Sequence, residues 1–461
     1  MEILSAEEVL FATEGELVWG TLDAKVNSVS IDSRKVSEGT LFVPIHGKKI
    51  NSHDFIEEVL KKGAKISLTE EERDFTGCVG TIIKVDNTIL ALQRLAKYYR
   101  NKFDVTVIGV TGSVGKTTTK EMIACGIGSN MEILKTEGNH NGQIGVPLTL
   151  LNLESKHQVA VIEMGISEIG EMERLADIAN VDIGVVTNIG LSHIENFKNI
   201  ETTRDEKLKL VKKPDGYYCL NGDNPMLMQV SEDLKDRVIY FGLNGKYAYK
   251  AEEISSSGGE TTFVLVTDEF RDTVKIPCMG IHNVYNALAA ITVAALLGIH
   301  LDDVKKGLMN YKGMAMRQQI LKIGDITVID DSYNASPDSA KGTIGILRNL
   351  ESDGKNIVVM ADMLELGEKS ADLHHRLGRY IALEGVDVLI TVGEMASYIA
   401  KGADEAGQQI IIEHCENNDE AFEKLINLLS PGDKVMVKGS RGMHTDAIVK
   451  KLKEKYKSYS V

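Results

Sequence analysis

The amino-acid sequence predicts an α/β protein of three domains: a small α/β N-terminal domain, a central P-loop domain with a mostly parallel sheet, and a C-terminal doubly wound, Rossmann-like domain. The chain has 461 residues, more than one hydrophobic core usually supports. From Val105 onward, near-continuous apolar runs alternate with helical patterns, which is typical of strands buried on both faces of a parallel sheet. A glycine-rich turn follows the first of these runs, in the order strand, loop, helix that a phosphate site requires.

The composition is that of a soluble globular protein, with 43% hydrophobic and 26% charged residues. A formal net charge of -15 argues against a generic nucleic-acid binder. The five cysteines are scattered and form no CxxC pair, which indicates free thiols in a reducing compartment. The N-terminus lacks the pattern of a signal peptide, and the longest apolar-rich stretch, Ala287 to Leu297, is too short to span a bilayer. We therefore expect a cytoplasmic protein with no membrane insertion. That the protein is a monomer is a separate expectation, which these features do not carry.

Residues 1–86 read as the first domain. Short strands are expected at 26–31, 40–44 and 81–85, with a helix at 53–62. Their weak alternation and glycine-rich connections favour a small α/β domain. Apolar residues at helical intervals in 87–103 predict a helix that leads into the next domain.

Residues 87–312 form the predicted central domain. Apolar runs at 105–110, 159–164 and 181–187 are expected to be buried parallel strands. A hairpin is expected from 261–266 and 270–276, followed by a helix that Gly298 should cap.

Residues 313–461 form the predicted C-terminal domain. Helical segments separate five expected strands, at 326–330, 356–360, 386–392, 409–413 and 433–438. This regular alternation predicts a self-contained doubly wound domain.

The segment VTVIGVTGSVGKTTTKEMI is the strongest local signal in the sequence. Gly112 and Gly115 let the backbone turn its N–H groups inward, Lys116 supplies a positive charge to phosphates, and the Thr117 hydroxyl is suited to Mg²⁺. Val110 stands where the strict Walker A pattern has its first glycine. The alternative is a glycine-rich turn with an incidental lysine.

Two residues follow buried strands where ligands bind in parallel sheets. Glu163 closes one strand, and His193 lies six residues past the next. A carboxylate in this position suits Mg²⁺, although Glu163 is equally consistent with a helix cap. Position alone favours an ordinary surface histidine for His193.

A similar group of polar residues marks the C-terminal domain. Asp330, Asp331, Tyr333 and Asn334 follow its first expected strand, and KGSRG (438–442) follows its last. Arg317, in the linker, could reach the nucleotide phosphates from the other side. Each of these is also explained by turn chemistry, so the evidence lies in their shared location at strand ends.

The ordered set of motifs resembles the Mur ligase family, which adds amino acids to the bacterial cell-wall precursor. The resemblance covers essentially the whole chain and rests on DSR (32–34), TGSVGKTT (111–118), TEGNHNGQIGVPLTLL (136–151), IEMG (162–165), TNIGLSH (187–193), HNVYNALAA (282–290), MRQQ (316–319), DDSYNASPDS (330–339), DMLELGE (362–368) and KGSR (438–441).

The resemblance implies ATP and Mg²⁺ as cofactors. The implied catalytic residues are Lys116, Glu163, His193 and Lys207, and the implied metal residues are Thr117, Glu163, His193 and Lys207, the last as a carbamate. The implied ATP contacts are Gly112, Ser113, Val114, Gly115, Lys116, Thr117, Thr118, Asn283, Asn286, Arg317 and Asp331.

The resemblance also implies the other substrates. DDSYNASPDS and DMLELGE are most similar to the family member that joins D-alanyl-D-alanine to UDP-N-acetylmuramoyl-tripeptide through an acyl phosphate. The first domain would then bind the UDP substrate, the second ATP, and the third the incoming amino component. Implied substrate contacts are Ser33 and Arg34 for the uridine diphosphate end, Asn139 and Asn141 for the muramoyl peptide, and Tyr333 and Asn334 near the dipeptide.

Two departures from the family pattern are present: Gly142 replaces an asparagine in the substrate loop, and Ala361 replaces a glycine before DM. The alternatives are a folate ligase, which would lack the first domain, a ligase for another amino acid, and a nucleotide-dependent switch. A switch would not need Glu163, His193 and Arg317 together, and the sequence contains no NKxD guanine-reading motif.

Overall fold

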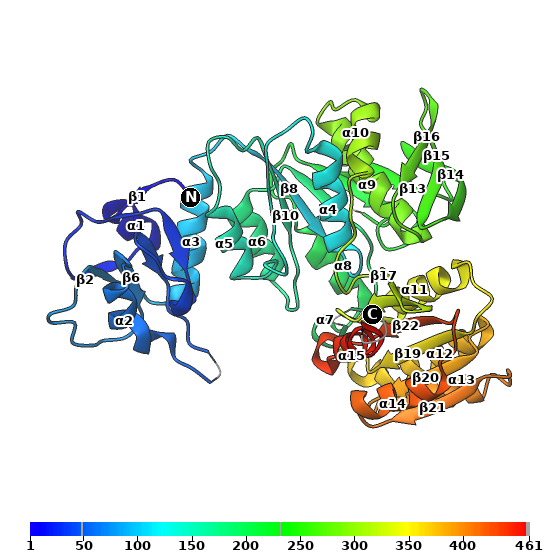
Figure 1. Cartoon of the computed structure of the whole chain (residues 1–461). Helices are drawn as coiled ribbons and strands as arrows, with labels where there is room; N and C mark the ends of the chain where they lie inside the picture. The colour runs from blue at the N-terminus through cyan, green and yellow to red at the C-terminus, as the bar shows by residue number, and fades with distance from the viewer. Residues whose placement is uncertain (48, 193, 231, 458–461) are drawn as a thin grey trace.

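The computed structural model describes residues 1–47, 49–192, 194–230 and 232–457. The elements form three lobes arranged along the molecule, each built around its own main sheet (Figure 1). The N-terminal lobe lies at one end, the C-terminal lobe at the other, and the central lobe between them.

The N-terminal lobe contains a five-stranded sheet in the order β2-β7-β6-β5-β4. Its elements are β1 (Leu4–Ser5), α1 (Ala6–Thr13), β2 (Glu16–Trp19), β3 (Lys25–Val26), β4 (Ser28–Ser30), η1 (Ser33–Lys35), β5 (Thr40–Phe42), η2 (Ser52–Phe55), α2 (Ile56–Lys61), β6 (Ile66–Thr69) and β7 (Thr81–Lys84). The single strand expected at 26–31 is wrong. It is split into β3 and β4, because Val26 pairs with Leu4 in a separate two-stranded sheet while Ser28 pairs with Thr40.

Helix α3 (Thr88–Arg100) connects this lobe to the central one. Asn87 caps it by accepting a hydrogen bond from the Leu90 N–H. One continuous core runs from Val9 of α1, through Leu95 of α3, to Leu150 and Leu175 on the central lobe. The N-terminal and central lobes are therefore fused through a shared hydrophobic interior.

The central lobe contains a nine-stranded sheet in the order β16-β15-β14-β13-β12-β11-β8-β10-β9. Its elements are β8 (Thr106–Thr111), α4 (Lys116–Ile127), β9 (Ile133–Lys135), α5 (Gly145–Leu150), β10 (Val159–Glu163), α6 (Glu171–Ala179), β11 (Ile183–Val186), α7 (Ile194–Phe197), α8 (Ile200–Leu208), β12 (Tyr217–Asn221), η3 (Glu232–Arg237), β13 (Val238–Gly242), β14 (Tyr249–Ser257), β15 (Glu260–Val266), β16 (Arg271–Ile276), α9 (Ile281–Leu296) and α10 (Leu301–Leu308).

This central sheet is parallel except for the antiparallel ribbon β14–β15–β16. Helices α4, α9 and α10 cover one face, while α5 and α6 pack on the other. The expected helix before Gly298 is present as α9, and Gly298 follows its last turn with a φ of 71°, as a left-handed C-terminal cap requires.

The C-terminal lobe contains a six-stranded sheet in the order β17-β18-β22-β19-β20-β21. Its elements are β17 (Gln319–Ile323), β18 (Ile326–Asp331), α11 (Pro337–Asn349), β19 (Asn356–Ala361), η4 (Gly367–Lys369), α12 (Ser370–Leu383), β20 (Val388–Val392), α13 (Ala396–Asp404), β21 (Ile411–Cys415), α14 (Asn418–Leu428), β22 (Lys434–Lys438), η5 (Arg441–Met443) and α15 (Asp446–Lys457). All strands are parallel except β17.

Separate hydrophobic cores cover the two faces of this sheet, so the doubly wound architecture is confirmed. Strands β8 and β10 of the central sheet end at Thr111 and Glu163, and β18 and β22 of the C-terminal sheet end at Asp331 and Lys438. These carboxyl ends face one another across the boundary between the two lobes. Within the described part of the chain, no helix has the length and apolarity needed to cross a membrane.

Candidate active site

The phosphate loop lies between β8 and α4. Gly112 and Gly115 have φ angles of 146° and 86°, a backbone region that favours glycine. A Cβ on Gly112 would lie 2.0 Å from Thr187 Oγ1, so no larger residue fits. The Lys116 ammonium donates to the Gly112 carbonyl over 2.8 Å. Because α4 begins at Lys116, the N–H groups of its first turn are positioned to receive an anion.

The loop after β11 holds the phosphate loop in place. Asn188 accepts a hydrogen bond from the Val114 N–H at Oδ1 (2.8 Å), and its carbonyl accepts one from the Ser113 N–H (3.0 Å). The Ser113 hydroxyl donates to the Gly190 carbonyl and accepts from the Gly190 N–H. The sequence segment TNIG therefore supports the phosphate loop, a role that was not expected from the sequence.

Glu163 is the buried carboxylate of this site, with only 1% of its surface exposed. Its Oε1 accepts hydrogen bonds from the Thr117 hydroxyl (3.1 Å) and from the Asn141 amide (2.7 Å). Its Oε2 is buried and has no hydrogen-bond partner among the described residues. An unpartnered buried carboxylate oxygen is costly unless a cation or a donor occupies the adjoining space. Together with the Thr117 hydroxyl, this atom forms a donor set that fits Mg²⁺.

Lys207, in the last turn of α8, is 2% exposed. Burial, helped by the positive charge of Lys116, lowers the pKa of Lys207 to about 7. Burial also lowers the pKa of Lys116, while the charge of Glu163 opposes this shift. Lys116 therefore influences the pKa of Lys207, and Glu163 influences the pKa of Lys116. His193 lies outside the described residues.

Asn283 and Asn286 lie on the first turns of α9. The Asn286 amide donates to Asn283 Oδ1 over 3.0 Å, and Asn286 Oδ1 accepts from the Thr119 hydroxyl over 2.9 Å. These hydrogen bonds connect α9 to α4, just behind the phosphate loop. Both asparagines are buried, and Asn286 faces the loop.

The C-terminal lobe contributes a second set of residues. The Asp331 carboxylate accepts from the Thr343 hydroxyl (2.6 Å) and from the Lys438 ammonium, which is itself buried. Lys438 also donates to the Asn334 carbonyl over 2.9 Å. The Arg317 guanidinium lies 4.0 Å from the centre of the Tyr333 ring, a cation–π arrangement.

Both sets face one cavity of about 390 Å³. The expected residues that line it are Ser113, Val114, Gly115, Lys116, Thr117, Thr118, Asn141, Glu163, Asn286, Arg317, Asp331, Tyr333 and Asn334. Gly112, Asn283 and Lys207 are not among the lining residues. Asn139 is exposed on the loop that carries Asn141.

Several other lining residues were not assigned a role from the sequence, among them Ser192, His282, Gln318 and Lys438. Lys438 is the last residue of β22, and its strand-end position was a usable signal. His282 and Gln318 lie inside quoted motifs, but only the folded chain brings them together.

A second cavity, of about 810 Å³, lies between the N-terminal and central lobes. Asp32 and Lys35 line it on one side, and Lys135, Glu137 and His140 on the other. Ser33 and Arg34 are adjacent but are not part of the lining. The Arg34 guanidinium donates to both Asp32 oxygens, and these hydrogen bonds lower the pKa of Asp32 to about 2.

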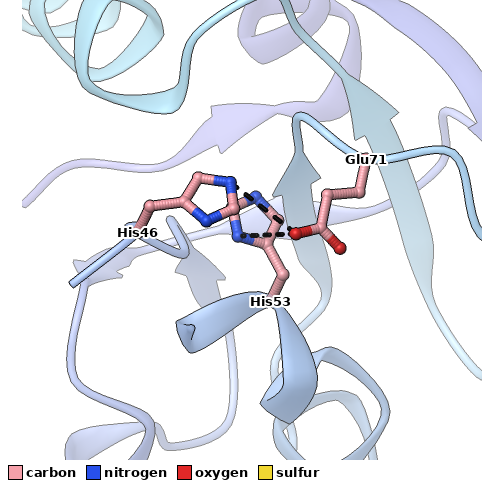
Figure 2. Close-up of side chains that lie close together, drawn as sticks. All are labelled: His46, His53 and Glu71. Carbon is pink, nitrogen blue, oxygen red and sulfur yellow. Dashed lines mark ion pairs between the residues drawn. The ribbon is translucent and has the colours of Figure 1, made fainter. Parts of the chain in front are cut away.

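A group of potential metal ligands, His46, His53 and Glu71, lies in the N-terminal lobe (Figure 2), and none of the three lines either cavity. His53 Nε2 accepts the Glu70 N–H over 3.2 Å, so its proton is on Nδ1, which faces Asn51 Oδ1 at 2.9 Å. A protonated Nδ1 has no lone pair for a metal ion. The hydrogen bonds therefore explain this cluster as a structural one.

Together, the fold and the cavity define a nucleotide-binding P-loop protein whose C-terminal sheet closes over the phosphate loop. More particularly, the chain belongs to the Mur ligase family. Residues 25–100 match the Mur ligase family catalytic domain, residues 110–294 the Mur ligase middle domain, and residues 316–441 the Mur ligase glutamate ligase domain.

Full-length relatives support this assignment. The UDP-N-acetylmuramoyl-tripeptide--D-alanyl-D-alanine ligase of Bacillus subtilis is 36% identical over 95% of this chain and 97% of its own. A crystal structure of MurF from Acinetobacter baumannii has a TM-score of 0.91 and 30% identity, covering 98% of this chain and 99% of its own. MurF from Thermotoga maritima in complex with ADP has a TM-score of 0.84 and 27% identity, covering 94% and 99% of the two chains.

Proposed function

We propose that this chain is an ATP-dependent ligase that joins D-alanyl-D-alanine to UDP-N-acetylmuramoyl-tripeptide in peptidoglycan precursor synthesis. The observation that carries the proposal is the single cavity where the phosphate loop of the central sheet meets the strand ends of the C-terminal sheet. The Bacillus subtilis relative, similar over the full length, identifies the acid and the amine.

The reaction requires activation of a carboxylate, because a carboxylate oxygen is a poor leaving group at neutral pH. A terminal carboxylate oxygen of the tripeptide attacks the γ-phosphorus of ATP, and ADP leaves. The dipeptide amine then attacks the acyl phosphate carbon, loses a proton, and releases inorganic phosphate. Lys116 and the N–H groups of the phosphate loop stabilise the charge that develops during phosphoryl transfer.

ATP would lie with its phosphates on the loop 112–118. Arg317 and Asp331 would contact it from the C-terminal lobe, and Asn283 and Asn286 from α9. The Thermotoga maritima relative was solved with ADP, which supports nucleotide binding by this chain. Thr117 and Glu163 would hold Mg²⁺, which neutralises phosphate charge when bound.

Lys207 would act as a carbamate, with His193 belonging to the same metal site. A pKa of about 7 leaves much of the Lys207 amine uncharged near neutral pH, and an uncharged amine can add CO₂ with loss of a proton. The resulting anion would lie in the positive field of Lys116. Its burial protects it from exchange with solvent.

The remaining substrates would bind across the lobes. Domain 1–86 would hold the UDP end, with Ser33 and Arg34 beside the 810 Å³ cavity. Asn139 and Asn141 would face the muramoyl peptide from domain 87–312. Domain 313–461 would receive the dipeptide, with Tyr333 and Asn334 near its amine.

The decisive experiment measures phosphate release from ATP with each substrate omitted in turn. Release that requires both UDP-N-acetylmuramoyl-tripeptide and D-alanyl-D-alanine supports the proposal. Phosphate release with a folate and glutamate, or with another amino acid in place of the dipeptide, would show a different ligase activity and overturn the proposal. Release that depends on neither acid nor amine would favour a nucleotide-dependent switch.

A further inference from the structure

Gln318 lies in the segment that connects the central lobe to the C-terminal lobe. It has a φ of 53°, and Met316, on the other side of Arg317, has a φ of 60°. Left-handed conformations are uncommon for residues with a side chain and persist only where surrounding contacts maintain them. The Gln318 N–H donates to Asp331 Oδ1 over 3.2 Å, which is one such contact.

The Gln318 side chain connects the two lobes. Its Oε1 lies 2.5 Å from Nε2 of His282, which belongs to α9 of the central lobe. Its Nε2 donates to the Thr343 hydroxyl oxygen over 3.1 Å, and Thr343 belongs to α11 of the C-terminal lobe. These side-chain contacts therefore join the lobes beside the phosphate cavity, which both His282 and Gln318 line.

The direction of each hydrogen bond follows from Asp331. Thr343 has one hydroxyl proton, and its neighbours Asp331 Oδ2 (2.6 Å) and the Ser339 carbonyl (3.0 Å) are both acceptors. The Thr343 oxygen can therefore only accept from Gln318, which fixes the Gln318 amide with its oxygen toward His282. His282 must then carry its proton on Nε2.

The packing around His282 agrees with this arrangement. Burial lowers the pKa of His282, so the neutral form is favoured despite the nearby Asp331 charge. Its Nδ1 is buried, without a partner among the described residues. This atom lies only 3.2 Å from where a Cβ on Gly342 of α11 would stand, so the two helices are in close contact here.

We infer that Gln318 is a positioning residue: through His282, Thr343 and Asp331 it fixes the C-terminal lobe over the phosphate cavity. The chain of hydrogen bonds starts at a carboxylate expected to contact the nucleotide and ends on the helix behind the phosphate loop. The two lobes thereby share one directional network. The effect on turnover rests on the proposed function, whereas the effects on lobe arrangement and on the His282 tautomer do not.

The test uses Gln318→Met in the full-length protein, which keeps side-chain length and backbone strain but removes both hydrogen bonds. We expect the KM for D-alanyl-D-alanine to rise about tenfold, as loss of a buried hydrogen-bond pair would predict, while the KM for the UDP substrate stays within about twofold. The matched control is Gln408→Met, at an exposed position of the same lobe, which should leave both constants unchanged.

Two measurements need no turnover. Small-angle scattering with a non-hydrolysable ATP analogue should give a larger radius of gyration for Gln318→Met than for the wild type and Gln408→Met. Nitrogen NMR should find His282 neutral and protonated on Nε2 in the wild type. In Gln318→Glu a carboxylate replaces the amide, so the pKa of His282 should rise, and this variant should not restore the dipeptide KM because it cannot donate to Thr343.

Thr343→Val provides an internal check, since its effect on the dipeptide KM should not add to that of Gln318→Met if both act through one network. A wild-type His282 protonated on Nδ1, or unchanged scattering and dipeptide KM in Gln318→Met, would overturn the inference. If phosphate release fails with the proposed substrates while scattering and NMR behave as described, the proposed function falls and the positioning role stands.

Discussion

The Asn141 amide donates a 2.7 Å hydrogen bond to Oε1 of Glu163, and this oxygen also accepts from Thr117. The loop that borders the cavity of the N-terminal lobe is thus connected directly to the buried carboxylate of the phosphate site. Glu163 Oε2 is buried, without a hydrogen-bond partner among the described residues. A contact in the 810 Å³ cavity can therefore influence the geometry of the phosphate cavity.

Asn141→Ala should lower kcat/KM by about 10- to 100-fold, because a hydrogen bond to a charged group contributes roughly 1.5–3 kcal/mol. Steady-state phosphate release measures this effect. Asn349→Ala, at an exposed position on α11, is the control and should behave as the wild type. Equal rates in both variants would show that the Asn141 contact does not contribute to the reaction.

Lys116→Ala should abolish ligation, since the phosphates lose their charged partner within the loop. The folded state should remain intact, because burial already disfavours the ammonium form of this lysine. Phosphate release and thermal unfolding should be recorded on the same sample. Normal turnover in this variant would remove the phosphate-loop assignment.

Lys207→Ala should be inactive and should recover part of its activity with short carboxylic acids, which supply the missing anion. The comparison is made at constant ionic strength, with chloride in place of the carboxylate as the control. Full activity of the variant without any added acid would discard the carbamate.

Lys207 should also make stability depend on pH in samples free of CO₂. Its folded pKa of about 7 lies below the ordinary lysine value of 10.5, so the unfolded chain binds more protons between these values and stability rises with pH. Below about pH 7 both states are protonated, and the cost of burying the charge is complete. Lys207→Met should therefore raise Tm at pH 7, with a gain that shrinks toward pH 10. A gain that is constant with pH would contradict a titrating Lys207.

Gly112→Ala should prevent nucleotide binding, because its Cβ would lie 2.0 Å from Thr187 Oγ1 in a loop that cannot retreat. Isothermal calorimetry with an ATP analogue tests this expectation. Gly258→Ala is the matched control: it also has a positive φ of 59°, but nothing lies within 4 Å of its Cβ. This control should cost about 1 kcal/mol of stability and leave binding unchanged.

Most strands buried on both faces were predictable from the sequence, because their apolar runs leave a continuous signal. The runs that became β8, β10 and β18 are examples. Strands β6 and β12 are buried but were missed, since polar residues such as Ser67 and Asn221 interrupt their runs. Strands β2, β9 and β17 were not found. They lie at sheet edges and are partly exposed, so polar residues interrupt their pattern. The antiparallel ribbon was recognised from its hairpin, but its first strand, β14, was missed.

Site residues at strand ends were predictable because parallel sheets collect them at one edge. The cavity gathers Lys116, Glu163 and Asp331 as that rule requires. Contacts between loops were not predictable, since the hydrogen bonds of Asn188 and Gln318 depend on how distant segments fold. The domain boundaries remain predictions, and so do the residue roles, which the experiments above test.

The continuous core that runs through α3 joins the N-terminal lobe firmly to the central lobe. Within the residues that the structure describes, the boundary between the central and C-terminal lobes has no such shared core. The C-terminal lobe is built around two cores to which, of the described residues, the central lobe contributes Met279 alone, and it follows a short connecting segment, so we expect it to be the lobe that moves. The UDP substrate, bound between the N-terminal and central lobes, would stay in place while the C-terminal lobe moves away and exchanges nucleotide and amine. The order of substrate binding would then follow from the fold: the largest substrate binds to the two lobes that share one core, and the other substrates enter at the boundary with the C-terminal lobe.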